Sequence, residues 1–385
     1  MILKPTVLKS IVGGSLLAAV AMAQSPTYKV IDLGTVGLNG QPFAVTKNGL
    51  AAGAAQIGNT LQAVLWYKGK TIDLGAPGLK GPNSQAFSVN AWGQAVGEAQ
   101  TDTPDPQGED FCGFAALGLA SSGTTCLPFV WQNGIMSPLP ALGGNNGVAN
   151  QINSAGQTVG MAEKDKPDST CPSGGPQKLE FKPAAWQNGN VRELPTYSGD
   201  PDGNAHALND SGQAAGGSGV CAAFNPIWLT NLQPLHALLW ESGKIVDLGN
   251  LGGTGHGDGI MALNLNNYGQ VIGSSDLPGD ASYHAFLWTH ETGMRDLGTL
   301  QGDVDSAAIG INDIGQIVGV SIDANFNPRA FLRQGQELID LNTLVPAGSP
   351  LDLASACSIN AAGEIVGFAF DSNFNVHAYM AVPIN

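Results

Sequence analysis

A short pattern that recurs seven times constrains the fold of this chain more than any other feature. In order, it consists of an aliphatic residue, a residue that is usually Asn, two variable residues and a Gly. A residue that is usually Gln, two small or branched residues and a second Gly follow. We call the first glycines anchors: Gly49, Gly93, Gly156, Gly212, Gly269, Gly315 and Gly363. A second glycine stands four positions after each anchor: Gly53, Gly97, Gly160, Gly216, Gly273, Gly319 and Gly367. Because the anchors recur about every fifty residues, the sequence predicts a repeat architecture.

Each copy of the pattern predicts four short β-strands. The residues before an anchor alternate between faces, with an aliphatic residue such as Val45 four positions before it, which is typical of a strand. Asn-x-x-Gly predicts a tight turn into a second strand, because Asn and Gly tolerate positive φ. A third strand carries His-Ala-Phe-Leu-Trp or a variant, and a fourth carries Asp-Leu-Gly or a relative. Four short strands without a helical pattern are typical of a propeller blade.

The two ends of the chain predict how the repeats close. The last unit has a third strand at His377 to Val382 and then no fourth strand, whereas Val30 to Gly34 has no unit of its own. The sequence therefore predicts an all-β fold, a seven-bladed β-propeller of four-stranded blades in which the N-terminal strand completes the C-terminal blade.

The repeated residues resemble the extracellular HAF repeat family of bacteria. The clearest match runs from His284-Ala285-Phe286 through Asp296-Leu297-Gly298 to Ile311-Asn312 and Gly319. Blades 2 and 3 depart most, with Pro138-Leu139-Pro140 and Glu193-Leu194-Pro195 in place of Asp-Leu-Gly. The resemblance implies export and repetition, and it implies no known reaction.

The repeated histidines, His236, His284 and His377, occupy equivalent positions in different blades. They cannot converge on one substrate, so we expect them to satisfy backbone groups where blades meet.

The N-terminal segment predicts export. Lys4 and Lys9 precede an apolar run that ends in Ala21-Met22-Ala23, which is typical of a signal peptide over residues 1–23. The run is too short to span a bilayer, so residues 24–385 are expected to form a single secreted or periplasmic propeller domain. The net charge of -15 argues against nucleic-acid or anionic-membrane partners.

Three insertions are expected to gather on one face of the ring, in blades 2, 3 and 4 at residues 100–126, 163–181 and 219–234. They include exposed aromatic candidates, Phe224 and Trp228. A partner-binding surface and tolerated loop growth remain open as interpretations, because loops accept insertions at low entropic cost. We expect the blade 2 insertion to be removable without loss of the fold.

Crossings between neighbouring blades are expected to place an acidic cluster beside these insertions: Asp200, Asp202, His256, Asp258, Asp303 and Asp305. Such residues could bind a cation or serve general acid/base chemistry, but they are also ordinary turn formers. The stretch from Asp200 to Asn204 lacks the downstream Glu of an EF-hand loop. Calcium is therefore an alternative, and no other cofactor or metal is predicted.

Five cysteines complete the set of candidate residues. Cys112, Cys126, Cys171 and Cys221 fall in the insertions, and an exported chain permits disulfides. Among three connectivities, we expect Cys112 with Cys126 and Cys171 with Cys221. Cys357, on an inner strand, is expected to be buried and free.

Two classes of function remain from the sequence. The first is an exported, monomeric, non-catalytic binding or interaction module that uses the inserted loops to contact an extracellular protein or glycan. The second is a hydrolase or lyase that acts on a polysaccharide or peptide through the acidic cluster. No nucleophile elbow, phosphate loop or zinc motif occurs in the sequence.

Overall fold

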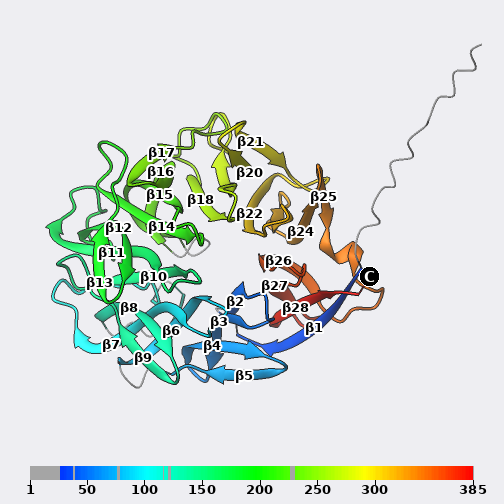
Figure 1. Cartoon of the computed structure of the whole chain (residues 1–385), viewed down its shortest axis with the longest axis horizontal. Helices are drawn as coiled ribbons and strands as arrows, with labels where there is room; N and C mark the ends of the chain where they lie inside the picture. Colours follow the sequence, from blue (N-terminus) through cyan, green and yellow to red (C-terminus); the bar gives the residue numbers. More distant parts are fainter. Residues whose placement is uncertain are drawn as a thin grey trace, which may run out of the picture.

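The computed structural model describes residues 27–37, 40–75, 79–115, 117–119, 123–225 and 230–384. They form seven antiparallel sheets of four strands each, arranged as blades in a ring (Figure 1). The predicted seven-bladed β-propeller is confirmed. The proposed signal peptide, residues 1–23, lies outside the described residues.

In every blade the chain runs from an inner strand outward. Blade 1 contains β2 (Gln41–Val45), β3 (Ala51–Ile57), β4 (Thr60–Tyr67) and β5 (Lys70–Asp73). Blade 2 contains β6 (Lys80–Val89), β7 (Ala95–Pro104), β8 (Thr124–Gln132) and β9 (Ile135–Pro138). Blade 3 contains β10 (Gly147–Ile152), β11 (Thr158–Pro167), β12 (Leu179–Gln187) and β13 (Asn190–Glu193). Blade 4 contains β14 (Asp202–Leu208), β15 (Ala214–Asn225), β16 (Thr230–Glu241) and β17 (Lys244–Asp247).

The remaining blades follow the same order. Blade 5 contains β18 (Ile260–Leu265), β19 (Val271–Asp276), β20 (Tyr283–Thr289) and β21 (Gly293–Gly298). Blade 6 contains β22 (Asp305–Ile311), β23 (Ile317–Ile322), β24 (Pro328–Gln334) and β25 (Glu337–Asp340), followed by the 3-10 helix η1 (Leu341–Leu344). Blade 7 contains β26 (Asp352–Ile359), β27 (Ile365–Phe370), β28 (Val376–Pro383) and, from the other end of the chain, β1 (Tyr28–Thr35).

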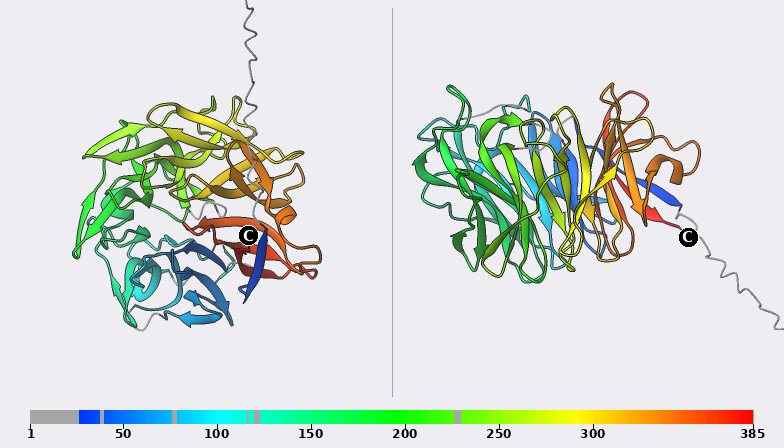
Figure 2. Two further views of the ribbon diagram at one scale, coloured as in Figure 1. Left: turned by 45° about the vertical axis from the view of Figure 1, so that its right-hand side comes forward. Right: turned by 90° about the horizontal axis from the view of Figure 1, so that it is seen from above.

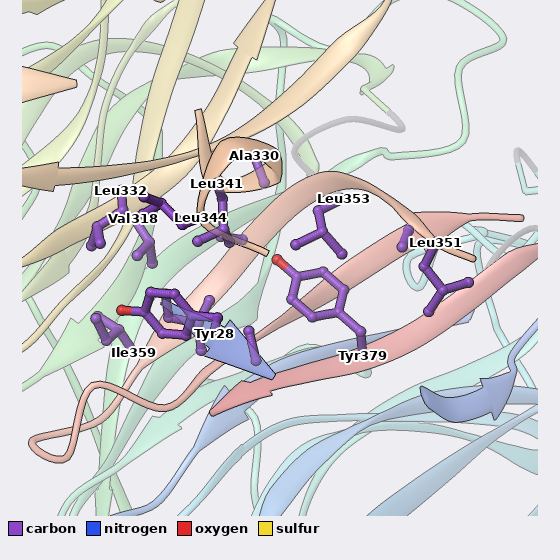
Figure 3. Packing of buried hydrophobic residues seen from close by; sticks show 14 residues of the cluster. Tyr28, Val318, Ala330, Leu332, Leu341, Leu344, Leu351, Leu353, Ile359 and Tyr379 are labelled. Atoms are coloured by element: carbon purple, nitrogen blue, oxygen red, sulfur yellow. The ribbon is translucent and has the colours of Figure 1, made fainter. Parts of the chain in front are cut away.

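The N-terminal strand closes the ring as the sequence predicts. β1 pairs antiparallel with β28, from Tyr28 opposite Pro383 to Thr35 opposite His377. Tyr28 is completely buried in a hydrophobic cluster that also contains Tyr379, Ile359 and residues of blade 6 (Figure 3). The strand therefore contributes both backbone hydrogen bonds and core packing to the last blade.

The second glycine of each repeat lies opposite a β-bulge in the inner strand. The pairing of β6 with β7 skips Phe87, and the other six inner strands skip the equivalent residue. A Cβ on Gly97 would lie 1.8 Å from the backbone oxygen of Gln85, closer than any real contact. Only glycine therefore lets the bulged inner strand approach its neighbour.

The ring has two distinct faces, which the edge-on view in Figure 2 separates. One face carries the connections between second and third strands and the crossings between blades, and we call it the inserted face. The opposite face carries the short turns, including the seven anchor turns. All seven anchor glycines have positive φ, between 70° and 80°, as the Asn-x-x-Gly pattern predicts.

Candidate functional site

The insertions of blades 2, 3 and 4 are only partly loops. Strand pairing continues into them, as far as Pro104 opposite Thr124 in blade 2 and Asn225 opposite Thr230 in blade 4. The prediction of loops over residues 100–126, 163–181 and 219–234 is thus wrong for the segments nearest the blades. In blades 2 and 3 these segments are polar and end in proline, which obscures the alternation typical of a strand.

Two disulfides hold the insertions, and both pairs are those predicted. Cys112 and Cys126 join the blade 2 insertion to β8, with 5.8 Å between their Cα atoms. Cys171 and Cys221 join the blade 3 insertion to β15 of blade 4, with 4.7 Å between Cα atoms. The second bond therefore ties neighbouring blades together. Cys357 is free and buried, as predicted.

The blade 2 insertion also has a hydrophobic core of its own. Phe114 is completely buried, and the ring of Phe111 meets that of Phe181 of blade 3 edge to face, with 6.2 Å between centroids. Both phenylalanines of the insertion belong to the same buried cluster as the Cys112–Cys126 pair. The insertion therefore packs against blade 3, and the expectation that it can be removed without loss of the fold stays a prediction.

A buried polar network lies beneath the same insertion, with Asn146 at its centre. The side-chain amide of Asn146 donates to Asp105 at 3.0 Å and to Glu163 at 2.9 Å. Its side-chain oxygen accepts the backbone N–H of Cys126 at 2.8 Å. All four residues are buried, so each of these hydrogen bonds replaces water that folding removes.

Two buried glutamates of this network contact each other. Glu109, from the blade 2 insertion, hydrogen-bonds to Glu163 of β11. Burial raises the pKa of Glu163 to about 9, and the neighbouring charge of Glu109 raises it further. Glu109 in turn accepts the backbone N–H groups of Lys178 and Leu179. Glu163 likewise accepts the backbone N–H groups of Asn145 and Asn146. The raised pKa of Glu163 is thus the ground on which we assign the proton to this carboxyl and the negative charge to Glu109.

A third buried glutamate lies in blade 2 itself. Burial raises the pKa of Glu98 to about 8, while the side-chain amide of Gln85 donates to it at 2.9 Å. The sequence did not single out Glu98, Glu109 or Glu163 as a buried group, since nothing in the chain order shows which insertion residues fold inward.

The predicted acidic cluster is distributed over separate contacts. In blade 4, Asp200 accepts the hydroxyl of Ser218 and contacts Nδ1 of His236 at 2.9 Å. Asp202 is completely buried and accepts the backbone N–H of Phe181 at 3.0 Å. Burial, together with neighbouring Asp168, raises the pKa of Asp202 to about 9.

The other four residues lie at the crossings into blades 5 and 6. Asp303 forms an ion pair with Arg329 at 2.7 Å, and Asp305 accepts the backbone N–H of Tyr283 at 3.1 Å. Asp258 and His256 are exposed. The pKa of Asp258 is raised by partial burial and by the charges of Asp276 and Asp305.

Two predicted contact residues cannot be placed. Trp228 and the side chain of Phe224 lie outside the described residues.

Among the described residues, groups of three potential metal ligands occur at two places, Glu98 with Cys112 and Cys126, and Asp168 with Cys171 and Cys221. In both, the cysteine sulfurs are already joined in a disulfide, so they do not offer thiolate ligands.

The repeated His of the HAF triplet pairs with a carboxylate. His284 contacts Asp296 at 2.9 Å and His377 contacts Asp32 at 3.1 Å, and each Asp belongs to an Asp-Leu-Gly on the adjacent outer strand. The same Asp accepts the N–H of the glycine, at 2.7 Å for Gly298. The expectation of a backbone partner is therefore wrong for His284 and His377, and their structural role stays a prediction.

Solved β-propellers resemble this fold. The β-propeller domain of the Trilobed protease from Pyrococcus furiosus shares 8% identity at a TM-score of 0.50, over 92% of this chain and 95% of that chain. The BP39L lectin from Burkholderia pseudomallei shares 11% identity at a TM-score of 0.41, over 94% of this chain and 99% of that chain. At 8% identity the similarity to the protease domain shows the fold alone. No protein-family model and no curated protein matches the chain.

In the part of the chain that the structure describes, no helix has the length and apolarity to cross a membrane.

Proposed function

We propose that the chain is an exported, non-catalytic binding module that contacts its partner through the inserted face of blades 2 to 4. The observation that carries this proposal is the construction of the blade 2 insertion, which combines a disulfide, buried phenylalanines and the Glu109–Glu163 pair. Loop growth that is merely tolerated needs no internal support of this kind. A rigid surface, in contrast, loses little conformational entropy on binding.

The alternative of a hydrolase or lyase has less support from the contacts of the acidic residues. Asp200 and Asp303 are engaged with His236 and Arg329. The glutamates with raised pKa, Glu163 and Glu109, are 0% and 1% exposed. A general acid must reach the proton acceptor on its substrate, so these buried groups fit a structural role better.

Export and the class of partner belong to the same proposal. The two disulfides and the absence of a membrane-crossing helix among the described residues fit a soluble protein of an oxidising compartment. The HAF resemblance and the N-terminal 23 residues suggest the same location. We propose a monomer whose partner is an extracellular protein or a glycan, with calcium as a candidate component of the acidic crossings.

The experiment that tests the proposal is a glycan and protein binding screen. The chain from Gln24 onward is labelled and applied to glycan and extracellular-protein arrays, with calcium or with a chelator. Saturable binding without turnover of the bound polymer supports the module. Cleavage of a polysaccharide or peptide would instead favour the hydrolase or lyase, and loss of binding in chelator would support a calcium site.

A further inference from the structure

A cavity of about 500 Å³ lies at the centre of the ring. Its wall contains the bulged residue of every inner strand, which the strand pairing leaves unpaired: Phe43, Phe87, Asn150, His206, Leu263, Ile309 and Cys357. The repeated bulge thus turns one side chain per blade toward the central axis. The volume is within the range of small-molecule sites, about 300–1,000 Å³.

The cavity wall has an aromatic side and a polar side. Phe43 and Phe87, from blades 1 and 2, meet edge to face with 4.9 Å between ring centroids, and Phe368 of blade 7 adds a third ring. Asn150 and His206, from blades 3 and 4, form the polar side. None of the described residues that line the cavity carries a formal charge, so the wall favours an uncharged ligand.

His206 is the polar group that the fold leaves unsatisfied. Its Nε2 is buried and has no hydrogen-bond partner. Burial lowers the pKa of this imidazole to about 4, so the ring is neutral at physiological pH. A buried polar atom without a partner is uncommon in folded proteins.

Phe326 stands at the mouth of the cavity in a strained conformation. It lines the cavity, is 84% exposed and has a φ of 64°, which bulky residues rarely adopt. Asp323 holds this turn by accepting the backbone N–H groups of Asn325 and Asn327, at 2.8 and 2.9 Å.

We propose that the central cavity binds a small, uncharged aromatic compound that carries one hydroxyl or amine group. The aromatic ring packs against Phe43 and Phe87, the polar group lies at the side of His206, and Phe326 covers the entrance. A sugar fits this wall less well, because its many hydroxyl groups would need polar partners that the apolar side does not offer. None of the described residues that line the cavity belongs to the insertions of blades 2 to 4.

Titration with N-phenyl-1-naphthylamine tests this proposal. The compound is an uncharged aromatic amine whose fluorescence rises in apolar surroundings. We expect saturable binding to the full chain. The double variant Leu263→Phe/Ile309→Phe fills the cavity with side chains that blades 1 and 2 already carry at this position, and should weaken binding at least tenfold. His206→Leu copies the residue of blade 5 and replaces a polar part of the wall with an apolar one, which should weaken binding about fivefold.

A matched pair of variants separates the cavity from general surface binding. Phe374 of blade 7 has the same turn, a φ of 62° and 81% exposure, but it does not line the cavity. We expect Phe326→Ala to weaken binding severalfold and Phe374→Ala to leave it unchanged, with both variants retaining the melting temperature of the parent. The proposal is overturned if the parent chain does not bind the probe, if the folded cavity-filling variant binds equally well, or if Phe374→Ala loses as much affinity as Phe326→Ala.

Discussion

The side-chain amide of Asn360, in the anchor turn of blade 7, donates a hydrogen bond to the backbone oxygen of Thr46 in blade 1, at 2.9 Å. The last blade is thus joined to the first at the centre of the opposite face. Equivalent amides repeat this bond to the next blade at 3.0 to 3.2 Å, from Asn90, Asn153, Asn209, Asn266 and Asn312. The residue after the anchor, Glu364 in blade 7 and Gln in blades 2 to 6, accepts from the same amide. The repeated Asn-x-x-Gly-Gln therefore encodes contact between blades as well as a turn.

Replacing this amide should weaken the closed ring. Asn360→Ala removes the bond to Thr46 and also the acceptor for the backbone N–H groups of Ala362 and Glu364. We expect a loss of about 2–3 kcal/mol in the free energy of unfolding, measured with urea. The exposed Asn373→Ala should change it by less than about 0.5 kcal/mol. Equal stabilities of the two variants would show that the amide series contributes nothing to closure.

Two buried tyrosines of blade 7 should respond in opposite directions to loss of the hydroxyl group. The hydroxyl of Tyr28 is buried without a hydrogen-bond partner, whereas that of Tyr379 donates to the backbone oxygen of Ser355 at 3.0 Å. We expect Tyr28→Phe to stabilise the protein by about 1 kcal/mol and Tyr379→Phe to destabilise it by a similar amount. Thermal and urea unfolding of both variants measure this difference. A loss of stability in Tyr28→Phe would mean that its hydroxyl has a partner in solution.

Stability should fall as the pH rises from about 5 to about 9. The pKa of Glu163 is raised to about 9 in the folded state, so the folded chain keeps a proton that the unfolded chain releases above its ordinary pKa. The stabilising effect of this proton is complete below the unfolded pKa and is lost as the pH rises through the folded one. Urea midpoints at pH 6 and pH 9 measure how much stability is lost over this range of pH.

Glu163→Gln keeps a neutral polar group in the network and removes the ionisation. We expect this variant to lose less stability than the parent between pH 6 and pH 9, while the exposed Glu337→Gln behaves like the parent. Unchanged pH dependence in Glu163→Gln would contradict the assignment of the proton to this carboxyl.

Loss of the disulfide between blades 3 and 4 should lower the free energy of unfolding more than replacement of the free cysteine. Cys171→Ser/Cys221→Ser opens a link across 50 residues, which is worth about 4 kcal/mol in the chain-entropy model. Cys357→Ala should leave both disulfides intact, as mapping of unreduced peptides would show. A disulfide that contains Cys357 would contradict the observed pairing.

The sequence is sufficient to predict the elements that each repeat encodes locally. Turn glycines such as Gly93, the strand alternation and the missing fourth strand of blade 7 all depend on neighbours along the chain, and the structure confirms them. Contacts between blades are different. Whether Asp303 meets another carboxylate or Arg329 depends on how far neighbouring blades rotate, which no local pattern records. The pairing of Glu109 with Glu163 likewise depends on how the blade 2 insertion folds back over blade 3.

The histidines likewise include contacts that the sequence records and contacts that it does not. His284 and His377 each contact the Asp of an Asp-Leu-Gly on the adjacent strand, whereas His236 contacts Asp200. Blades 2 and 3 lack both the His and the Asp, which is the part of this pairing that the sequence records. The bulge that turns His206 toward the central cavity leaves no such signal, since it becomes visible only when the register of β14 and β15 is known.

The most direct test of the account compares binding at the two faces. Thr103 and Ser169 are exposed on the insertions of blades 2 and 3, whereas Trp92 and Tyr268 are 74% and 75% exposed in anchor turns of the opposite face. The affinity of the tightest-binding glycan or protein from the screen is measured for Thr103→Arg/Ser169→Arg and for Trp92→Ala/Tyr268→Ala, each with an unchanged melting temperature. We predict that the first variant loses at least tenfold in affinity and that the second stays within twofold of the parent. Full affinity in the first variant, with loss in the second, would place the partner on the opposite face and contradict the account.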